Sequence, residues 1–281
     1  MQLDATGALP RRDSPFLVLG CCTLAAVAYA GTVGAIWPGL DMLLPLLAVF
    51  LASAVASIAG FAFAPICAVM LVHLVDEPMR IVSIILVASI AMQGYSVLHL
   101  WRDLDWRGGV PFLLGGLATL PLGLLLLLQI SGRGHILLLG TLLMVFAAWM
   151  LWRPPSAPQD AGPRWAQVLV GAAGGVTGGL LAFPAAPVVV WCGVRGLGRG
   201  AARGLTQPYI LMMQVAALLL LQVMDPGRGA LSSADPELLL TVAPALFGTV
   251  CGLALFDRLS DQQFGRTLSG MLLVAGGTMV L

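Results

Sequence analysis

The stretch Gly60-Phe61-Ala62-Phe63-Ala64-Pro65 lies near the middle of an uncharged apolar run of 34 residues, 42–75. A continuous helix of that length would be about 51 Å long, because a helix rises about 1.5 Å per residue. The hydrocarbon core of a bilayer is only about 30 Å thick. Since glycine weakens a helix and proline fits the first turn of a new one, the stretch predicts a break in a membrane-embedded helix.

The composition indicates a membrane protein. The chain has 281 residues, of which 59% are hydrophobic and 10% are charged, whereas soluble domains carry about 25% charged residues. Lipid offers no hydrogen bonds to a bare backbone, so long uncharged runs must form helices or a closed barrel. The runs lack the alternation of a barrel strand, which predicts an all-α, polytopic integral membrane protein in the lipid bilayer. The net charge of +1 gives no reason to expect nucleic acid as a partner.

The motifs of common enzymes and metal sites are absent from the sequence. The five cysteines form no CxxC pair and the three histidines are isolated, so we expect no metal and no other cofactor. The sequence has no phosphate-binding loop, no GxSxG and no HExxH, and no Asp or Glu lies inside an apolar run. We therefore expect a protein that is not an enzyme.

A second break echoes the first. Gly179-Leu180-Leu181-Ala182-Phe183-Pro184 has the glycine-to-proline spacing of the first stretch at an offset of 119 residues, and Met213-Gln214 echoes Met92-Gln93 at an offset of 121. In each half, one long apolar run is followed by three shorter ones. The sequence therefore predicts an N-terminal tail with an extra transmembrane helix (1–41), two transmembrane repeats (42–152 and 165–281) and a Pro-rich linker (153–164).

Two membrane topologies are compatible with these runs. Each long run either crosses once, which gives nine spans and parallel repeats, or forms a hairpin, which gives seven crossings and inverted repeats. With a cytoplasmic amino terminus, the nine-span topology leaves five arginines outside, whereas the hairpin topology leaves only Arg80, Arg133 and Arg228. Cytoplasmic loops are enriched in positive residues, which favours the hairpins.

The amino-terminal run predicts a multi-pass protein of the cell inner membrane with its N-terminus in the cytoplasm. Ala28-Tyr29-Ala30 is similar to a signal-peptidase cleavage site, so removal of a signal peptide is the alternative. The uncharged run 14–40 is long enough to span the bilayer, and we favour an uncleaved first helix.

The breaks also predict a binding site. Backbone N–H groups in the first turn of a helix have no internal partner, and the positive ends of half-helices near the midplane can hold an anion. Hydroxyl and amide side chains nearby add donors without a buried charge. The same residues also have purely structural explanations. Glycines allow close packing between helices, and arginines orient the chain by the positive-inside rule. The predicted substrate-binding residues are Ser57, Gly60, Phe61, Pro65, Gln93, Thr177, Gly178, Gly179, Pro184, Pro187, Arg203, Gln207 and Gln214.

Four motifs in order resemble those of the sulfite exporter TauE/SafE family. They are the stretch 59–65, Leu104-Asp105-Trp106-Arg107 followed by Leu120-Pro121-Leu122-Gly123, the glycine-rich 174–179, and Arg203 with Gln207-Pro208-Tyr209. The resemblance covers about residues 42–281 and implies a duplicated transporter of sulfite, sulfonates or other small organic anions. Family members commonly continue the second break with further glycines, whereas this chain continues with Leu180-Leu181-Ala182-Phe183.

These observations lead to the expectation of a secondary transporter for a small anionic substrate such as sulfite, a sulfonate or another small organic acid. Rocking of one repeat against the other would alternate access to the site. A passive anion channel and a membrane-embedded subunit or enzyme of a periplasmic pathway are the alternatives. The sequence permits a homo-oligomer and leaves the coupling ion open.

Overall fold

The computed structural model describes residues 29, 31, 40–59, 61–152, 162–224, 236–256, 269–270, 272–273, 276–277 and 279–280. Four sequence predictions fall outside these residues: Gly60, nearly all of the first helix, linker residues 153–161 and Arg228. Throughout the described ranges the regular structure is helical and no strand occurs.

The first half contains five α-helices and a short 3₁₀ turn, η1. They are α2 (Leu40–Ala59), α3 (Phe63–Leu71), α4 (Pro78–His99), η1 (Trp101–Asp103), α5 (Trp106–Gln129) and α6 (Gly132–Trp152). Local signals set their starts. α4 begins at a proline, which suits the first helical position. In front of α5, the Asp105 carboxylate accepts a 2.8 Å hydrogen bond from the Gly108 N–H, as a capping residue does.

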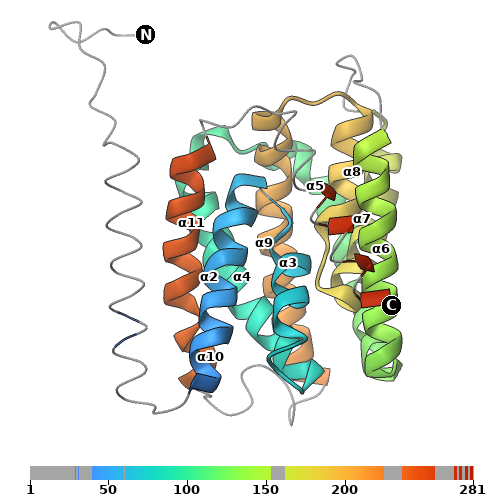
Figure 1. The fold of residues 1–281 in the computed structure, drawn as a ribbon. Helices are drawn as coiled ribbons and strands as arrows, with labels where there is room; N and C mark the ends of the chain where they lie inside the picture. Colours follow the sequence, from blue (N-terminus) through green and yellow to red (C-terminus); the bar gives the residue numbers. More distant parts are fainter. Residues whose placement is uncertain are drawn as a thin grey trace, which may run out of the picture.

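The second half follows in a similar order. Its helices are α7 (Arg164–Leu181), α8 (Ala185–Val194), α9 (Arg199–Met224), α10 (Pro236–Leu240) and α11 (Val242–Phe256), with further helical residues between 269 and 280. Figure 1 shows these helices side by side in one bundle, with α2 and α3 next to α4, and α7 and α8 next to α6.

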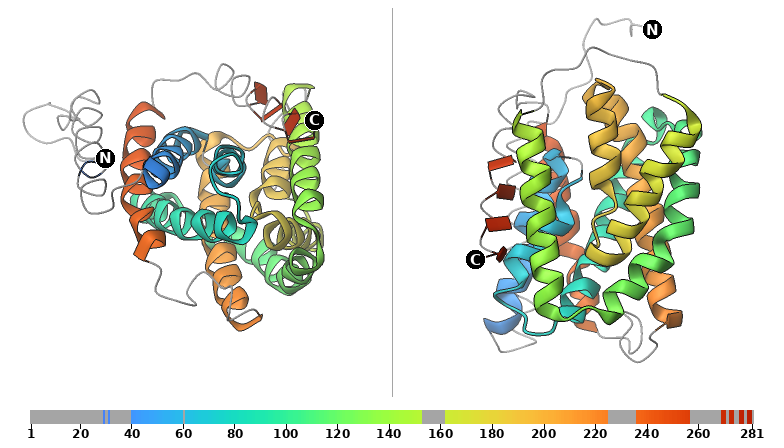
Figure 2. Two further views of the ribbon diagram at one scale, coloured as in Figure 1. Left: turned by 60° about the horizontal axis from the view of Figure 1, so that its bottom comes forward. Right: turned by 90° about the vertical axis from the view of Figure 1, so that its right-hand side faces the viewer.

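Each long apolar run turns back within the bundle. Met42 at the start of α2 and Leu74 after α3 line the same pocket, so both outer ends of this pair lie at one end of the bundle. Gly162, before α7, is close enough to Arg195, after α8, that a Cβ on the glycine would lie 2.5 Å from the guanidinium. The two turns point in opposite directions in Figure 1. Figure 2 shows the bundle from two further directions. We call α2–α3 hairpin 1 and α7–α8 hairpin 2.

The two halves interlock. α7 packs along α5, and α2 packs along α11, so the first helix of each half lies against the next long helix after the third in the other half. α4 also packs against α9, and each hairpin contacts the third helix of its own half. This reciprocal pairing is what an inverted duplication would produce, although the duplication itself stays a prediction.

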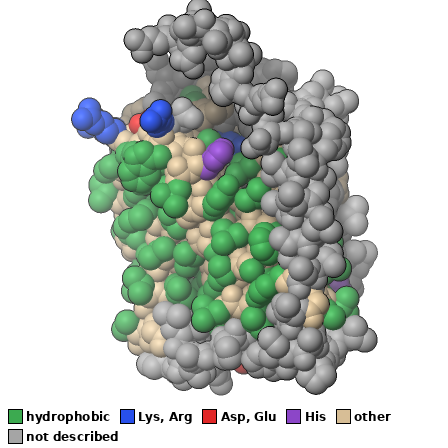
Figure 3. All heavy atoms as spheres, turned by 90° about the vertical axis from the view of Figure 1, so that its left-hand side faces the viewer, with side chains coloured by type: hydrophobic (Ala, Val, Ile, Leu, Met, Phe, Trp, Pro, Cys, Tyr) green, Lys and Arg blue, Asp and Glu red, His purple; other side chains and the backbone are tan. Residues whose placement is uncertain are grey.

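The surface of the described helices fits a lipid environment. Four of them are long and apolar enough to cross a membrane by length and composition, namely Met79–His99, Trp106–Gln129, Gly132–Trp152 and Gly200–Met224. Large apolar side chains such as Leu98, Trp152 and Val223 are exposed, and Figure 3 shows one face covered mainly by hydrophobic side chains, with arginines at one end. The prediction of an all-α, polytopic membrane protein is confirmed.

Candidate functional site

The two breaks occur at matching places. α2 ends at Ala59 and α3 begins at Phe63, whereas α7 ends at Leu181 and α8 begins at Ala185, so both helix ends are related by 122 residues. The offset of 119 that relates the stretch 60–65 to the stretch 179–184 in the sequence is three residues too short for the helix ends. The corrected offset pairs Phe61 with Phe183 and Pro65 with Pro187.

The shift of register moves two predicted residues away from the break. Gly178 and Gly179 lie inside α7 and not in the break itself, and their part in substrate binding stays a prediction. Both serve close packing. A Cβ on Gly179 would lie 2.6 Å from the backbone nitrogen of Leu124 in α5, and one on Gly178 would lie 2.9 Å from the side chain of Pro184. Small residues allow such approach between membrane helices, and that need explains glycine within a helix here.

One aromatic side chain links the breaks. Phe146 of α6 is buried, and the rings of Phe61 and Phe183 each lie 5.8 Å from its ring in edge-to-face geometry. Edge-to-face contacts place the positive edge of one ring against the negative face of another and favour a defined orientation. The aromatic residues of both breaks therefore meet at Phe146, within one buried apolar cluster.

The short helices begin in the same way at both breaks. Neither N-terminus receives a hydrogen bond from a capping side chain, and the third helical residue is Pro65 in α3 and Pro187 in α8. Proline has no N–H, so the first turn of each helix has two N–H donors, those of Phe63 and Ala64 in α3 and of Ala185 and Ala186 in α8. Such N–H groups carry the positive end of the helix dipole and suit an anion.

Arg203 is buried beside the first break. Its side chain is 7% exposed, and its guanidinium donates a hydrogen bond to the carbonyl oxygen of Ser57 in the last turn of α2. A cation at the C-terminus of a helix meets carbonyl groups that have no partner within the helix. Buried charges are costly within a membrane and often mark function. The structure thus brings together the predicted residues Arg203 and Ser57.

Further polar oxygen atoms are buried in α2, α4 and α9. The side chains of Ser57, Ser89, Gln93 and Gln214 are at most 3% exposed. In the described part of the chain, the hydroxyl oxygens of the two serines and the amide oxygens of the two glutamines have no hydrogen-bond partner. Buried polar groups are nearly always satisfied, so such atoms call for an explanation.

The helices that carry these atoms converge on the breaks. Ala88 and Met92, which flank Ser89 and Gln93 in α4, belong to one buried apolar cluster with Phe63 and Phe183. On α9, Arg203, Gln207 and Gln214 recur at spacings of four and seven residues and share one helix face. Gln207 is also buried. We therefore place the candidate site between the two breaks, α4 and α9.

The remaining predicted residues have local roles. The Thr177 hydroxyl donates to the carbonyl oxygen of Gly174, and the Thr177 carbonyl accepts from the N–H of Ala182 and of Phe183. Pro184 directly precedes α8. Sequence reasoning missed Phe146, which has no local signal, and Ser89, although its spacing of four residues from Gln93 could have revealed it. Among the residues that the structure describes, no group of three or more His, Cys, Asp or Glu side chains could hold a metal ion.

Comparison with known proteins gives a family. The model of the family described as sulfite exporter TauE/SafE matches residues 44–279, which include both breaks and every residue of the candidate site. No curated protein and no solved structure matches the chain. The match covers most of the sequence and agrees with the resemblance seen in the motifs. The chain belongs to the sulfite exporter TauE/SafE family, a family of membrane transporters.

Proposed function

We propose that this protein is a secondary transporter that carries a small anion, such as sulfite, a sulfonate or another small organic acid, across the cell inner membrane. Its N-terminus lies in the cytoplasm. The anion binds between the two breaks, where the first-turn N–H groups of α3 and α8 and the side chains of Ser57, Gln93 and Gln214 surround it. The observation that carries the proposal is the pair of uncapped helix N-termini at the two breaks, with the buried hydroxyl of Ser57 and the cationic Arg203 near the first of them.

The charge at the site favours an anion over a cation. The ionisable side chain described at the site is the arginine Arg203, and its guanidinium holds the end of α2. Backbone N–H groups and amide N–H groups donate hydrogen bonds to an oxyanion without adding a fixed charge. A weakly charged site also lets the ion leave, which a transport cycle requires.

The hairpins provide a route to alternating access. Hairpin 1 and hairpin 2 enter from opposite ends of the bundle, and their tips meet at Phe146. Rocking of one half against the other would expose the shared site first to one side of the membrane and then to the other. The reciprocal packing of α2 on α11 and α7 on α5 supports movement of each hairpin with the opposite half.

The test is uptake into proteoliposomes of labelled sulfite, sulfate, a sulfonate and a short carboxylate, with and without an imposed pH gradient. We expect uphill accumulation of one of these anions. Gln93→Leu and Gln214→Leu should each reduce the rate by about tenfold or more while the protein stays folded, because leucine replaces an unsatisfied amide of similar size.

Gln129→Leu, at the exposed end of α5, is the matched control and should leave uptake unchanged. Flux that never exceeds equilibrium would indicate a passive anion channel with the same site. If none of the anions moves under any gradient, the proposed function is wrong.

A further inference from the structure

His135 of α6 holds the end of α7, next to the second break. Its Nε2 atom lies 2.9 Å from the carbonyl oxygen of Leu180, which belongs to the last turn of α7, where carbonyl groups have no partner within the helix. A carbonyl oxygen only accepts hydrogen bonds, so the Nε2 atom carries a hydrogen and donates it. In the neutral ring, the other nitrogen, Nδ1, then carries a lone pair that can accept a proton.

Arg203 has the same place in hairpin 1. Its guanidinium donates to the Ser57 carbonyl in the last turn of α2, so a basic side chain from the opposite half of the chain holds the first arm of each hairpin. The two side chains differ in one property. Arginine stays charged, whereas histidine gains or loses a proton between about pH 5 and pH 8. The charge can therefore change at the end of α7 but not at the end of α2.

His135 also lines a pocket beside the second break. The pocket has a volume of about 190 Å³, and its wall includes Leu181 and Ala182. The side chains that α3, α4 and residue Met279 turn toward it are apolar, and among the described lining residues the titratable group that shares the pocket with His135 is the carboxylate of Asp76, in the segment after α3. On α6 itself, Arg133 is exposed.

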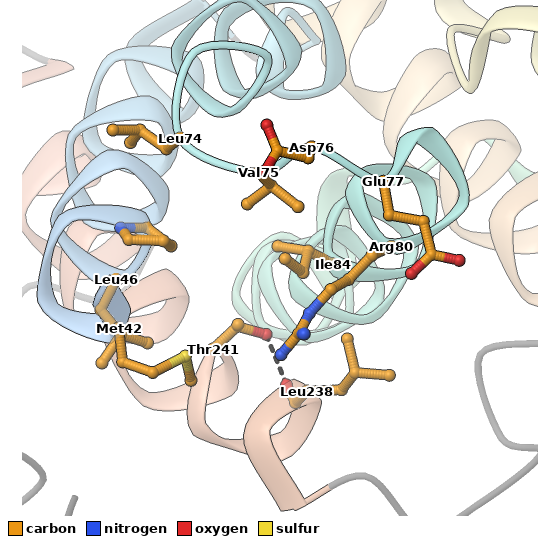
Figure 4. A pocket seen from close by; sticks show the side chains of 11 residues that line it. Met42, Leu46, Leu74, Val75, Asp76, Glu77, Arg80, Ile84, Leu238 and Thr241 are labelled. Atoms are coloured by element: carbon orange, nitrogen blue, oxygen red, sulfur yellow. Dashed lines mark hydrogen bonds between the residues drawn. The ribbon is translucent and has the colours of Figure 1, made fainter. Parts of the chain in front are cut away.

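A larger pocket adjoins this one at the end of the bundle where α2 begins and α3 ends. It has a volume of about 400 Å³ and shares Val75 and Asp76 with the smaller pocket. Figure 4 shows Val75, Asp76 and Glu77 along one side of it. The carboxylates of the exposed residues Asp76 and Glu77 outnumber the one guanidinium in its lining, that of Arg80. A negative lining raises the local concentration of cations, protons included, so the two pockets suit the entry of protons toward His135.

A proton on His135 calls for a negative charge nearby. An imidazolium against an apolar wall is costly, and an anion close to it lowers that cost. Leu180, which His135 holds, precedes Ala185 by five residues, and the N–H of Ala185 belongs to the first turn of α8. An anion at the second break would therefore lie near the imidazolium. Each of the two ions would favour the binding of the other, because coupling between two binding sites is reciprocal.

We propose that His135 is the proton-binding residue of this transporter and that a proton binds at its Nδ1 atom when an anion binds at the second break. The proton adds to the lone pair and no other bond breaks. Proton and anion leave together on the other side of the membrane, which makes the transport a proton–anion symport. This inference rests on the proposed function for the anion, but the hydrogen bond of His135 and the two pockets do not depend on it.

Nitrogen NMR tests the proton site without transport. The chain has three histidines, His73, His99 and His135, so the ring signals of protein that carries isotope-labelled histidine can be assigned by replacing each residue in turn. The protein is titrated in detergent with methanesulfonate present. We expect His135 to keep its hydrogen on Nε2 throughout and to gain a proton on Nδ1 between about pH 8 and pH 5. A ring that stays neutral over this range would overturn the proposal.

His135→Gln separates the proton from the hydrogen bond. The glutamine amide can still donate to the Leu180 carbonyl, but it takes up no proton. With one proton per anion, an outside that is more acidic by about one pH unit supports about tenfold accumulation of a monovalent anion such as methanesulfonate. We expect the unmodified chain to reach about this ratio in proteoliposomes, and His135→Gln to move the anion only down its own gradient.

Two further variants complete the comparison. His73→Gln, at an exposed histidine after α3, is the matched control and should accumulate the anion like the unmodified chain. His135→Leu also loses the hydrogen bond to Leu180, so it should unfold at a lower temperature than His135→Gln. This difference shows whether glutamine has kept the structural role of the histidine.

The outcomes separate this inference from the proposed function. If no anion moves but His135 gains a proton on Nδ1, the proposed function is wrong and the proton site remains. If the unmodified chain and His135→Gln accumulate an anion equally well under a pH gradient, His135 is not the coupling residue and the proposed function stands.

Discussion

The contact between α5 and α7 and the contact between α2 and α11 are made in different ways. Glycines line both sides of the α5–α7 contact. A Cβ on Gly115 of α5 would lie 1.9 Å from the carbonyl oxygen of Val168, and one on Gly171 of α7 would lie 2.0 Å from that of Phe112. Backbone therefore lies against backbone at these points, and the small Thr119 side chain of α5 donates a 2.6 Å hydrogen bond to the Ala172 carbonyl of α7.

In the contact between α2 and α11, the α11 side alone supplies glycine. Gly248 and Gly252 of α11 lie against Ser53, Ala54 and Ser57 of α2. The side chains of hairpin 1 thus remain in the contact, and one of them brings a buried hydroxyl to the first break. Hairpin 2 meets its partner mainly through bare backbone.

The difference suggests a division of roles between the hairpins. Arg203 holds the carbonyl of Ser57 at the tip of hairpin 1, whereas the residue that matches Arg203 at the offset of 122 is Ile81, which lines the pocket at Leu181 and Ala182. Hairpin 1 carries the polar groups, and hairpin 2 is a close-packed scaffold. We infer that changes at α5–α7 will chiefly affect stability, and changes at the tip of hairpin 1 will chiefly affect transport.

The largest effect is expected for Gly171→Ala in the α5–α7 contact. The new Cβ would lie 2.0 Å from the carbonyl oxygen and 2.6 Å from the carbonyl carbon of Phe112, and backbone cannot move aside easily. The free energy of unfolding should fall by about 3 kcal/mol or more, at the upper end of overpacking costs. Thermal unfolding of the purified protein in detergent measures the change.

Gly109→Ala in α5 is the matched control, because nothing lies within 4 Å of a Cβ at that position. Alanine is a better helix former, so this variant should be unaffected or more stable by up to about 1 kcal/mol. Equal behaviour of the two variants would mean that the two helices are not in close contact in the membrane.

The next effect is the loss of transport in Arg203→Leu. The variant loses a charge-assisted hydrogen bond to Ser57, which costs about 1.5–3 kcal/mol, but burial of a charge in the membrane costs about as much. The two terms offset, so stability should change little while the uptake rate falls by about tenfold or more. Arg203→Lys keeps the charge and should retain part of the activity.

The control for Arg203 is Arg102→Gln in η1, an exposed arginine. Uptake and thermal unfolding are measured on all three variants. Should Arg203→Leu transport as well as Arg102→Gln, the tip of hairpin 1 would have no special role and the proposed contrast between the hairpins would fail.

A smaller effect distinguishes Ser57→Ala from Ser53→Ala in α2. The Ser53 hydroxyl donates a 2.9 Å hydrogen bond to the Phe50 carbonyl, whereas the Ser57 hydroxyl has no hydrogen-bond partner. Ser53→Ala should therefore cost about 1 kcal/mol of stability and leave KM unchanged. Ser57→Ala should leave stability unchanged and raise KM by about three- to tenfold, the value of one hydrogen bond to the substrate. If Ser53→Ala raises KM while Ser57→Ala lowers only stability, then Ser57 does not contact the substrate and the prediction is wrong.

Much of this architecture was predictable, because apolar runs, glycines and prolines report directly on membrane helices and their breaks. The first break falls where Gly60 and Pro65 predict it. The second break falls within the predicted stretch 179–184, but the offset between the breaks was three residues too short. Glycine has two uses in a membrane helix, as a break and as a close-packing residue, and Gly178 and Gly179 have the second use. Phenylalanine four residues before proline, as in Phe61 and Pro65, is the pattern that both breaks share.

The candidate site was less predictable than the fold. The position of Arg203 at the border of an apolar run indicated burial, but the Ser57 carbonyl as its partner depends on the meeting of segments 146 residues apart. Phe146 lies in an unbroken apolar helix and has no signal that separates it from its neighbours. Contacts of this kind follow from the packing of helices and not from local sequence.

The smallest effect, and the most direct test of the matched breaks, is expected for Ala182→Gly. Ala182 has φ 52° and ψ 23°, in the left-handed region that an alanine side chain disfavours by about 1–2 kcal/mol. The residue that corresponds to it at an offset of 122 is Gly60. Glycine adopts this conformation freely, although it also gains entropy in the unfolded chain, so Ala182→Gly should raise the free energy of unfolding by about 0.5–1 kcal/mol and leave uptake unchanged.

Ala173→Gly, in the middle of α7, is the control and should lower stability by about 1 kcal/mol because its backbone is helical. If both variants lose stability to the same extent, hairpin 2 does not turn at Ala182, and the offset of 122 loses its structural basis.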